Sequence, residues 1–184
     1  MSKRFTILIL SLAVVAAAFG GPALAQDDCD FVGEIYLGVI APLTGDIPKV
    51  GQDTVEAAQM AVDEINAACG LEVDGESYEV IIVVEDNESK AESSVAVATR
   101  LIVEEDVLGI IGPQASKQAV PTGQVANDRE TPMISPWSTN PDTTFDRPWV
   151  FRAAFLDPFQ GPVVASFVQS NQQVTEVLLQ RLPV

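Results

Sequence analysis

Small hydrogen-bonding side chains gather in the stretch ISPWSTNP, residues 134–141. Two prolines bracket a tryptophan, two hydroxyls and an amide, which are groups that can hold a small polar solute. The chain has no histidine, which removes serine–histidine–aspartate triads, cysteine–histidine pairs and the commonest metal ligand. Glycine-rich dinucleotide and phosphate-loop motifs are also missing from the sequence. We therefore expect solute binding, with no catalysis, no cofactor and no metal.

Three residues are candidate ligand contacts, each with an ordinary structural alternative. Ser116 falls near the start of an expected helix, where free N–H groups and the dipole attract a carboxylate. Its alternative role is to cap that helix. Thr139 could hydrogen-bond an ammonium or a carboxylate, or it could be an ordinary turn hydroxyl. Trp137 could form a pocket wall, or it could pack in the core.

The elements that must position these residues alternate between strands and helices. Strands are expected at 34–42, 78–86, 107–112, 132–135 and 149–155, and helices at 51–70, 89–106, within 116–129 and at 159–171. This order predicts an α/β fold with a mainly parallel sheet and helices on both faces. Ligands of such sheets bind beyond the carboxyl ends of the strands, so the loops at those ends should converge on one site.

Local patterns sharpen three of these expectations. In the first helix Val55, Ala58, Val62 and Ile65 share one face, and Gly70 marks the end. Ser89 with an acid three residues later forms a capping-box pattern for the second helix. The apolar run 107–112 is of the type buried on both faces of a parallel sheet.

The first 25 residues have the pattern of a cleaved secretory signal peptide. A basic start precedes an apolar stretch at 5–19 and an A-L-A cleavage site that ends at Ala25. The alternative, a membrane anchor, would need about 20 apolar residues. Cleavage would remove Lys3 and Arg4 and would take the net charge from −16 to −18. Because phosphate binding needs clustered Lys and Arg, we expect no nucleic-acid partner.

The two cysteines fit an oxidising compartment. Cys29 precedes the first expected strand, and Cys69 ends the first expected helix. Both points lie at the same end of a strand–helix unit, so a Cys29–Cys69 disulfide is geometrically plausible. Two free buried thiols are the alternative.

An ordered set of motifs resembles the periplasmic branched-chain amino acid-binding proteins, which are type I substrate-binding proteins of ABC transporters. The set runs P-L-T-G, a helix closing in D-E-I-N, then I-G-P-x-x-S, I-S-P-x-S-T-x-P, F-R and D-x-x-Q-G, over residues 34–168. The resemblance implies lobe one of a type I periplasmic binding fold and a periplasmic or extracellular location. It also implies a ligand that is an amino acid or an amide-like solute, and a membrane permease as partner.

The resemblance also implies which residues hold the α-carboxylate and α-ammonium of the ligand. The family's serine and neighbouring backbone match Gln114, Ala115 and Ser116, and its carbonyl and threonine match Trp137, Ser138 and Thr139. A first-loop position, often aromatic in the family, matches Val50. Valine offers no ring there, and Trp137 stands where relatives often have a small residue. Amides, urea and aromatic acids therefore stay open as ligands beside branched-chain amino acids.

Relatives of this kind have two lobes and roughly twice this length. We expect residues 26–171 to form an incomplete amino-terminal lobe and 172–184 to be an atypical tail produced by truncation or a frameshift. The leading hypothesis is an extracytoplasmic solute-binding protein. The alternatives are a sensor module of the same fold acting on a receptor, a non-binding fragment, and an α/β enzyme, against which the missing histidine argues.

Overall fold

The structure, a computed structural model, describes residues 29–171 of the chain. Its six strands form one sheet in the order β2-β3-β1-β4-β5-β6, in which only β2 runs antiparallel to its neighbour. The strands are β1 (Gly33–Ala41), β2 (Leu71–Val73), β3 (Glu76–Asp86), β4 (Gly109–Ile111), β5 (Met133–Ser135) and β6 (Val150–Arg152). The predicted α/β fold with a mainly parallel sheet is confirmed.

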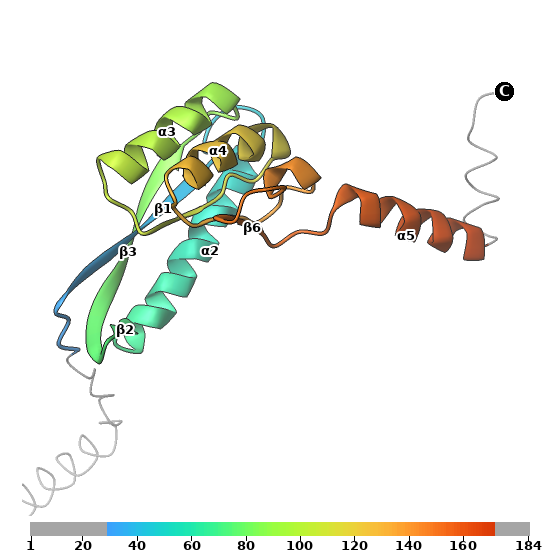
Figure 1. Cartoon of the computed structure of the whole chain (residues 1–184). Helices are drawn as coiled ribbons and strands as arrows, with labels where there is room; N and C mark the ends of the chain where they lie inside the picture. The colour runs from blue at the N-terminus through green and yellow to red at the C-terminus, as the bar shows by residue number, and fades with distance from the viewer. Residues whose placement is uncertain (1–28, 172–184) are drawn as a thin grey trace, which may run out of the picture.

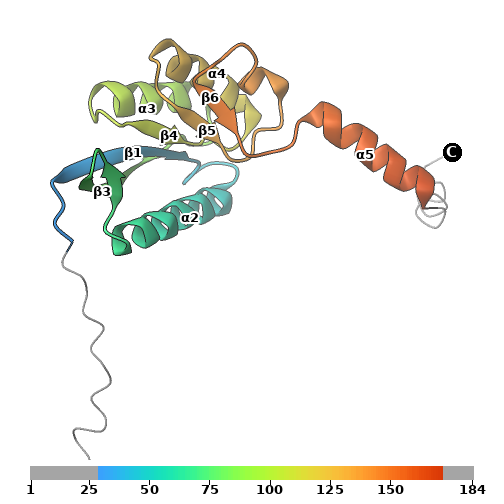
Figure 2. The same cartoon turned by 60° about the horizontal axis from the view of Figure 1, so that its bottom comes forward.

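Helices cover the two faces of the sheet unequally (Figures 1 and 2). The helices are α2 (Pro48–Ala67), α3 (Ala91–Val103), α4 (Ser116–Asp128), the short 3₁₀ helix η1 (Pro141–Thr143) and α5 (Asp157–Ser170). The two helices α3 and α4 lie side by side on one face, while α2 alone lies on the other. The last helix, α5, extends away from both layers and has no buried residue. None of the described helices is long and apolar enough to cross a membrane.

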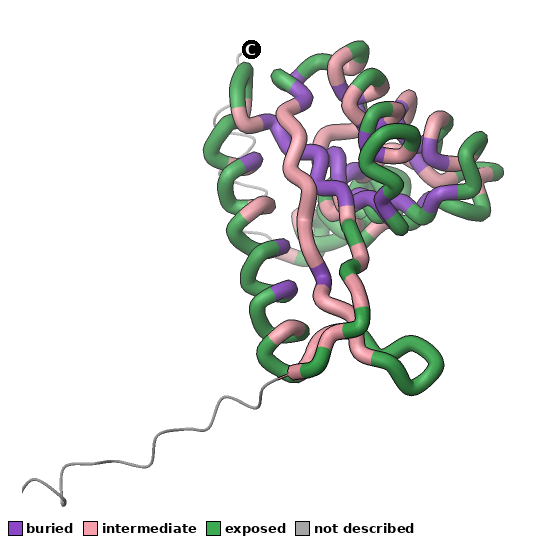
Figure 3. Tube along the Cα trace, turned by 90° about the vertical axis from the view of Figure 1, so that its left-hand side faces the viewer, coloured by how far each residue is buried: buried purple, intermediate pink, exposed green. Residues whose placement is uncertain are grey.

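Buried residues of the strands and helices build a core on each face of the sheet, and Figure 3 colours the buried residues purple along the chain. Ile40, Ile110 and Met133 pack beneath α3 and α4 with Leu101, which is fully buried. On the opposite face the smaller cluster of Val39, Ala41 and Ala58 lies under α2. Because Val39 and Ile40 are adjacent in β1, they point to opposite faces, as the period of a strand requires.

The bounds and the buried face of α2 differ in detail from those predicted. This helix begins at Pro48, three residues before its predicted start, because proline is well suited to a first helical turn. Ala58 and Val62 are buried as expected, but Ile65 is 38% exposed. Gly70 ends the helical segment with φ +75°, and a Cβ there would lie 2.1 Å from the carbonyl oxygen of Tyr78. The short strand β2 that follows was not predicted, because three exposed residues carry no alternation of burial.

Two other local expectations were wrong. Ser89 does not cap α3, which begins at Ala91 after Lys90 and has no side-chain cap. Ser89 instead adopts φ 57° and bonds to the loop after β1. The apolar run around β4 is not buried on both faces, since Leu108 is 61% exposed and Ile111 is half-buried.

The predicted disulfide is present. Cys29 and Cys69 are joined with a Cα–Cα distance of 5.1 Å and a sequence separation of 40, and no described cysteine is free. The bond ties the segment before β1 to the end of α2. The predicted signal peptide (1–25) and the predicted atypical tail (172–184) both lie outside the described residues.

Candidate solute-binding rim

Four loops meet at the carboxyl ends of the parallel strands. They follow β1, β3, β4 and β5 at residues 42–47, 87–90, 112–115 and 136–140, and we call them the rim. Hydrogen bonds join these loops in two groups. Ser135, the last residue of β5, donates to the carbonyl oxygen of Pro113 in the loop after β4, and Ser138 in the loop after β5 donates to Ser116, the first residue of α4. The loop after β1 bonds to the loop after β3 through Ser89.

Three hydroxyls form a connected chain between the loop after β5 and α4. The Oγ of Ser138 donates to the Oγ of Ser116 at 2.9 Å, and it lies 2.6 Å from the Oγ1 of Thr143. A hydroxyl has one proton to donate. Since Ser138 gives its proton to Ser116, Thr143 must be the donor in the second contact. The proton of Ser116 is then left to bond a ligand.

Ser116 is not a helix cap. The N-cap residue of α4 is Ala115, and no side chain caps this helix. The backbone N–H groups of Ser116 and Lys117 have no acceptor among residues 29–171, as expected for the first turn of a helix. The start of α4 therefore presents a hydroxyl and free N–H groups together, which suits an anionic group such as a carboxylate.

One arginine holds the loop that carries Ser138. Arg152, in β6, donates to the carbonyl oxygens of Ser138 (3.3 Å), Asn140 (2.7 Å) and Pro141 (3.0 Å), and also to the hydroxyl of Thr144. Burial lowers the pKa of Arg152, which Asp157 partly offsets. The guanidinium satisfies two carbonyls of the loop after β5 and that of Pro141, the first residue of η1. The loop is therefore held in one conformation by β6.

Arg147 ties the same region to α4. Its Nη1 donates to the carbonyl oxygens of Val120, Asp142 and Thr143, and its Nη2 donates to the side chain of Gln124. This arrangement places η1, and with it the hydroxyl of Thr143, against the helix that begins at Ser116.

The other residues predicted from the stretch 134–141 lie near this chain of hydroxyls in sequence. The hydroxyl of Thr139, half-buried, has no hydrogen-bond partner within residues 29–171, while its carbonyl oxygen accepts from the N–H of Asp157 at 3.0 Å. Trp137 is 51% exposed, so it does not pack in the core. Both side chains are available to a ligand.

Gln114 and Val50 stand apart from that group. Gln114 is 1% exposed, and neither atom of its side-chain amide has a partner in the described part of the chain. Next to it, Ala115 is half-buried. Val50 lines an open groove of about 430 Å³ between α2 and the sheet, which also touches Pro136 of the loop after β5. The groove brings the first-loop position to the same stretch of chain as Trp137.

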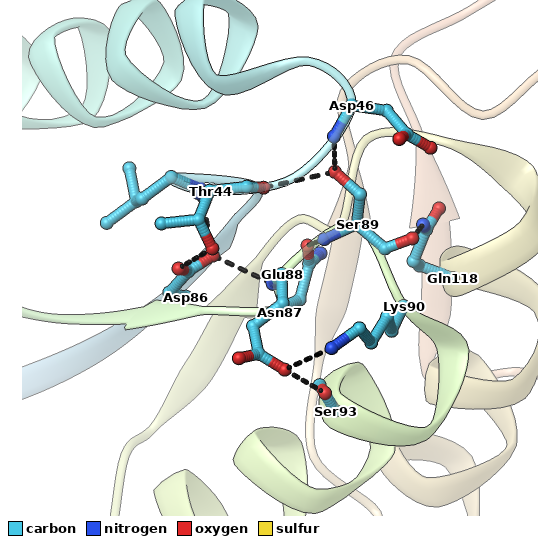
Figure 4. A network of polar contacts seen from close by, with 10 residues as sticks. Thr44, Asp46, Asp86, Asn87, Glu88, Ser89, Lys90, Ser93 and Gln118 are labelled. Atoms are coloured by element: carbon cyan, nitrogen blue, oxygen red, sulfur yellow. Dashed lines mark hydrogen bonds and ion pairs between the residues drawn. The ribbon is translucent and has the colours of Figure 1, made fainter.

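The second group of loops centres on Asp86, at the end of β3 (Figure 4). Its carboxylate accepts from the N–H and hydroxyl of Thr44, with the hydroxyl at 2.6 Å, and from the N–H groups of Leu43 and Glu88. Burial raises the pKa of Asp86, but these hydrogen bonds outweigh it, and the pKa lies below its usual value. Asp86 therefore fixes the P-L-T-G loop to β3 as a carboxylate.

Ser89 connects this group to α4. Its Oγ accepts from the N–H of Asp46 at 2.9 Å and donates to the carbonyl oxygen of Thr44 at 3.2 Å. The carbonyl oxygen of Ser89 accepts from the side chain of Gln118, which is buried in α4. Figure 4 shows these side chains converging from three segments of the chain.

Sequence reasoning missed the residues that support the rim. Thr143, Arg147 and Asp86 were not assigned a role, because their partners are distant in sequence and no local pattern marks them. Arg152 stood in the F-R motif that we quoted, which was the one signal that could have pointed to it. No group of three or more Cys, Asp or Glu residues within 29–171 could hold a metal ion.

Comparison with known proteins identifies the family. The model of a family described as periplasmic binding protein matches residues 34–180. A Leu/Ile/Val-binding protein homolog from Brucella melitensis is 31% identical over 170 residues, which are 92% of this chain and 43% of that protein. The chain thus spans about two fifths of the length of the curated relatives that it matches.

Solved structures of binding proteins resemble this chain as well. The leucine-binding protein LivK from Thermotoga maritima has 37% sequence identity and a TM-score of 0.67, covering 76% of this chain and 38% of that one. LivJ from Streptococcus pneumoniae, solved with isoleucine, has 31% identity and a TM-score of 0.67, covering 73% and 38%. Both relatives are described as binding proteins, not as enzymes. The resemblance inferred from the motifs is confirmed, and the chain belongs to the periplasmic binding protein family.

Proposed function

We propose that this chain provides one wall of a binding site for an amino acid or a related small polar solute, in an extracytoplasmic protein that delivers the solute to an ABC permease. Family membership implies the extracytoplasmic location. Export through cleavage after Ala25 is part of the proposal. The names of the relatives, which include proteins that bind leucine, isoleucine and valine, support the amino-acid class.

The observation that carries the proposal is the hydroxyl chain that ends at Ser116. Ser138 donates to Ser116, so Thr143 is left as the donor to Ser138, and the hydroxyl proton of Ser116 is not used within this chain of hydroxyls. Free N–H groups in the first turn of α4 add to it. A carboxylate accepts from O–H and N–H donors of this kind, and a hydrogen bond to a charged group contributes about 1.5–3 kcal/mol in a formed site.

Thr139 and Trp137 would complete this wall. The free hydroxyl of Thr139 can accept from the α-ammonium of the ligand. Trp137, half exposed, can cover the ligand side chain, and Val50 leaves room where relatives often carry a ring. The backbone of Gln114 and Ala115 lies between β4 and Ser116 and would line the carboxylate side.

A single wall binds weakly, because water competes for every donor. We expect a dissociation constant no lower than roughly millimolar, which corresponds to a binding free energy of about −4 kcal/mol. Titration of the ¹⁵N-labelled chain with isoleucine, leucine, phenylalanine, glutamate and urea, followed by NMR, measures it. Amide shifts should appear first at Ser116 and in the loop after β5. If no amide signal shifted up to the solubility limit of each solute, binding would be refuted. A micromolar dissociation constant would refute the claim that this chain provides only one wall of the site.

Matched variants assign the residues. Ser116→Ala and Thr139→Val should each weaken binding at least about fivefold, the equivalent of about 1 kcal/mol. Ser166→Ala, which removes an exposed hydroxyl on α5, should leave it unchanged. Equal affinity in all three variants would place the site elsewhere.

A further inference from the structure

A single buried amide connects the two groups of rim loops. The loop after β1 is bonded to the loop after β3, while the loop after β5 is bonded to the start of α4. Within residues 29–171 one hydrogen bond joins the first group to α4, from the Nε2 of Gln118 to the carbonyl oxygen of Ser89 at 2.6 Å (Figure 4). Gln118 lies two residues after Ser116 in the same helical turn, so this bond fixes the spacing between the two groups.

The partner of Gln118 determines how its amide is oriented. A carbonyl oxygen can only accept a hydrogen bond, so the nitrogen end of the amide must face Ser89. The other end, Oε1, is buried and has no partner within the described residues. A buried acceptor without a partner destabilises the fold, whereas an apolar side chain of the same size would not. The side chain of Gln118 is therefore suited to one task, which is to donate to Ser89.

The bond holds Ser89 in an unusual backbone conformation. Its φ is 57° and that of Glu88 is 51°, values that residues other than glycine rarely adopt. The N–H of Ser89 donates to the Oδ1 of Asn87 at 3.0 Å, and its carbonyl oxygen accepts from Gln118. The backbone of Ser89 is thus bonded on one side to its own loop and on the other to α4. Without Gln118 its buried carbonyl oxygen would have to turn toward water.

The loop after β1 follows Ser89, because the two loops are in direct contact. The Oγ of Ser89 accepts from the N–H of Asp46 at 2.9 Å and donates to the carbonyl oxygen of Thr44 at 3.2 Å. A Cβ at Gly45 would lie 2.6 Å from the carbonyl oxygen of Glu88, so no gap separates the loops at this point. A shift of Ser89 would therefore displace the loop after β1.

We propose that Gln118 is a positioning residue for the solute site, which sets the loop after β1 against the first turn of α4 through Ser89. This role rests on the proposed function, in which a solute carboxylate binds at that first turn. Gln118 does not touch the solute, since only 5% of it is exposed. The side chain is already enclosed by the described residues, so its bond to Ser89 does not depend on further parts of a longer protein.

Gln118→Met separates positioning from stability. Methionine is close to glutamine in length and volume but has no donor, and it removes the unpartnered Oε1 together with the bond to Ser89. These two changes have opposite effects on the free energy of unfolding, so the urea midpoint should change little. Gln118→Asn is the second variant, because it keeps an amide but is too short to reach Ser89.

Thr122→Val is the matched control. Thr122 lies one turn after Gln118 in α4, and its Oγ1 donates to the Oγ of Ser94 in α3 at 2.9 Å. Both hydroxyls are fully buried, so the variant breaks a buried bond of α4 and leaves the hydroxyl of Ser94 without its donor. It should lower the urea midpoint but should leave Ser89 and the loop after β1 in place.

The first measurement needs no solute. In the ¹³C,¹⁵N-labelled chain, the one-bond Cα–Hα coupling of Ser89 reports the sign of its φ, and hydrogen exchange at the N–H of Asp46 reports its bond to Ser89. In Gln118→Met and Gln118→Asn the φ of Ser89 should turn negative, and the N–H of Asp46 should exchange at least about tenfold faster. In Thr122→Val both should match the wild type. Unchanged φ and exchange in the two Gln118 variants would overturn the proposal.

The second measurement is titration with isoleucine. Gln118→Met should weaken binding about fivefold, although Gln118 does not touch the solute, and Thr122→Val should bind as the wild type does. A displaced loop with unchanged affinity in Gln118→Met would overturn the role in binding, and so would equal weakening in Thr122→Val. A wild type that binds none of the solutes would refute the proposed function and with it this role, whereas the first measurement would still decide whether Gln118 holds the loop.

Discussion

The hydroxyl of Ser138 donates to the hydroxyl of Ser116 at 2.9 Å, which joins the loop after β5 to the first turn of α4. Neither residue needs the other for its local conformation. The contact exists because β4 and β5 are neighbours in the sheet and end at the same edge. It leaves the hydroxyl proton of Ser116 without an acceptor among residues 29–171, and that is the proton which the proposed carboxylate would accept.

Thr143→Val should destabilise the fold, because it leaves the buried oxygen of Ser138 without its donor. Thr143 and Ser138 are both fully buried, so we expect a loss of about 1–3 kcal/mol in the free energy of unfolding. Urea denaturation measures it. Thr143→Ser keeps the hydroxyl and should retain most of the stability. Equal urea midpoints for the valine variant and the wild type would contradict the hydroxyl chain.

Asp86→Asn should lower the melting temperature at neutral pH and have a smaller effect in acid. The folded-state pKa of Asp86 lies below its usual value, so the carboxylate contributes stability above the unfolded pKa of about 3.9. That contribution is lost as the pH falls through the folded pKa. The difference in melting temperature between wild type and variant should shrink below pH 4 or so.

Thr44→Val is the companion variant for Asp86. It removes the hydroxyl that donates to the carboxylate at 2.6 Å and should weaken the same pH dependence. A constant difference between wild type and Asp86→Asn from neutral pH into acid would show that the carboxylate is not held as described.

Replacing both Cys29 and Cys69 by serine should cost about 3–4 kcal/mol in the chain-entropy model, given a separation of 40 residues. Unfolding by urea under non-reducing conditions compares the variant with the wild type. Adding a reductant to the wild type should produce the same loss, and should not affect the variant. A wild type indifferent to reductant would contradict a stabilising bond.

Gly51→Ala should destabilise α2 although alanine is the better helix former. A Cβ at Gly51 would lie 2.2 Å from the carbonyl oxygen of Pro42, which is backbone and cannot move aside. The overpacking should cost roughly 1–3 kcal/mol. Gly161→Ala in α5 is the control, because nothing lies within 4 Å of that position. It should raise helix content by circular dichroism, and loss of stability in both variants alike would refute the role of the contact.

The sequence by itself determined the class of fold and the order of its main elements. Apolar strands that alternate with helical segments predict a mainly parallel sheet whose loops gather at one edge. Cys29 and Cys69 could be paired because each flanks an element at the same end of a strand–helix unit. Ser116 could be placed near the start of a helix expected within 116–129, although Pro121 obscured the residue at which that helix begins.

Tertiary structure alone decided how those residues act. Ser89 looked like a helix cap, but contacts with Thr44 and Asp46 from another loop drew it away. Ser116 became a donor through Ser138 and Thr143, whose hydroxyls meet only when the sheet has formed. The exposure of Ile134 and Phe151, which are paired between β5 and β6, was equally invisible in the sequence, since the two residues belong to different strands. The local sequence pattern shows the hydrophobic period of a single helix or strand. Contacts between residues far apart in the sequence depend instead on the order and register of the strands.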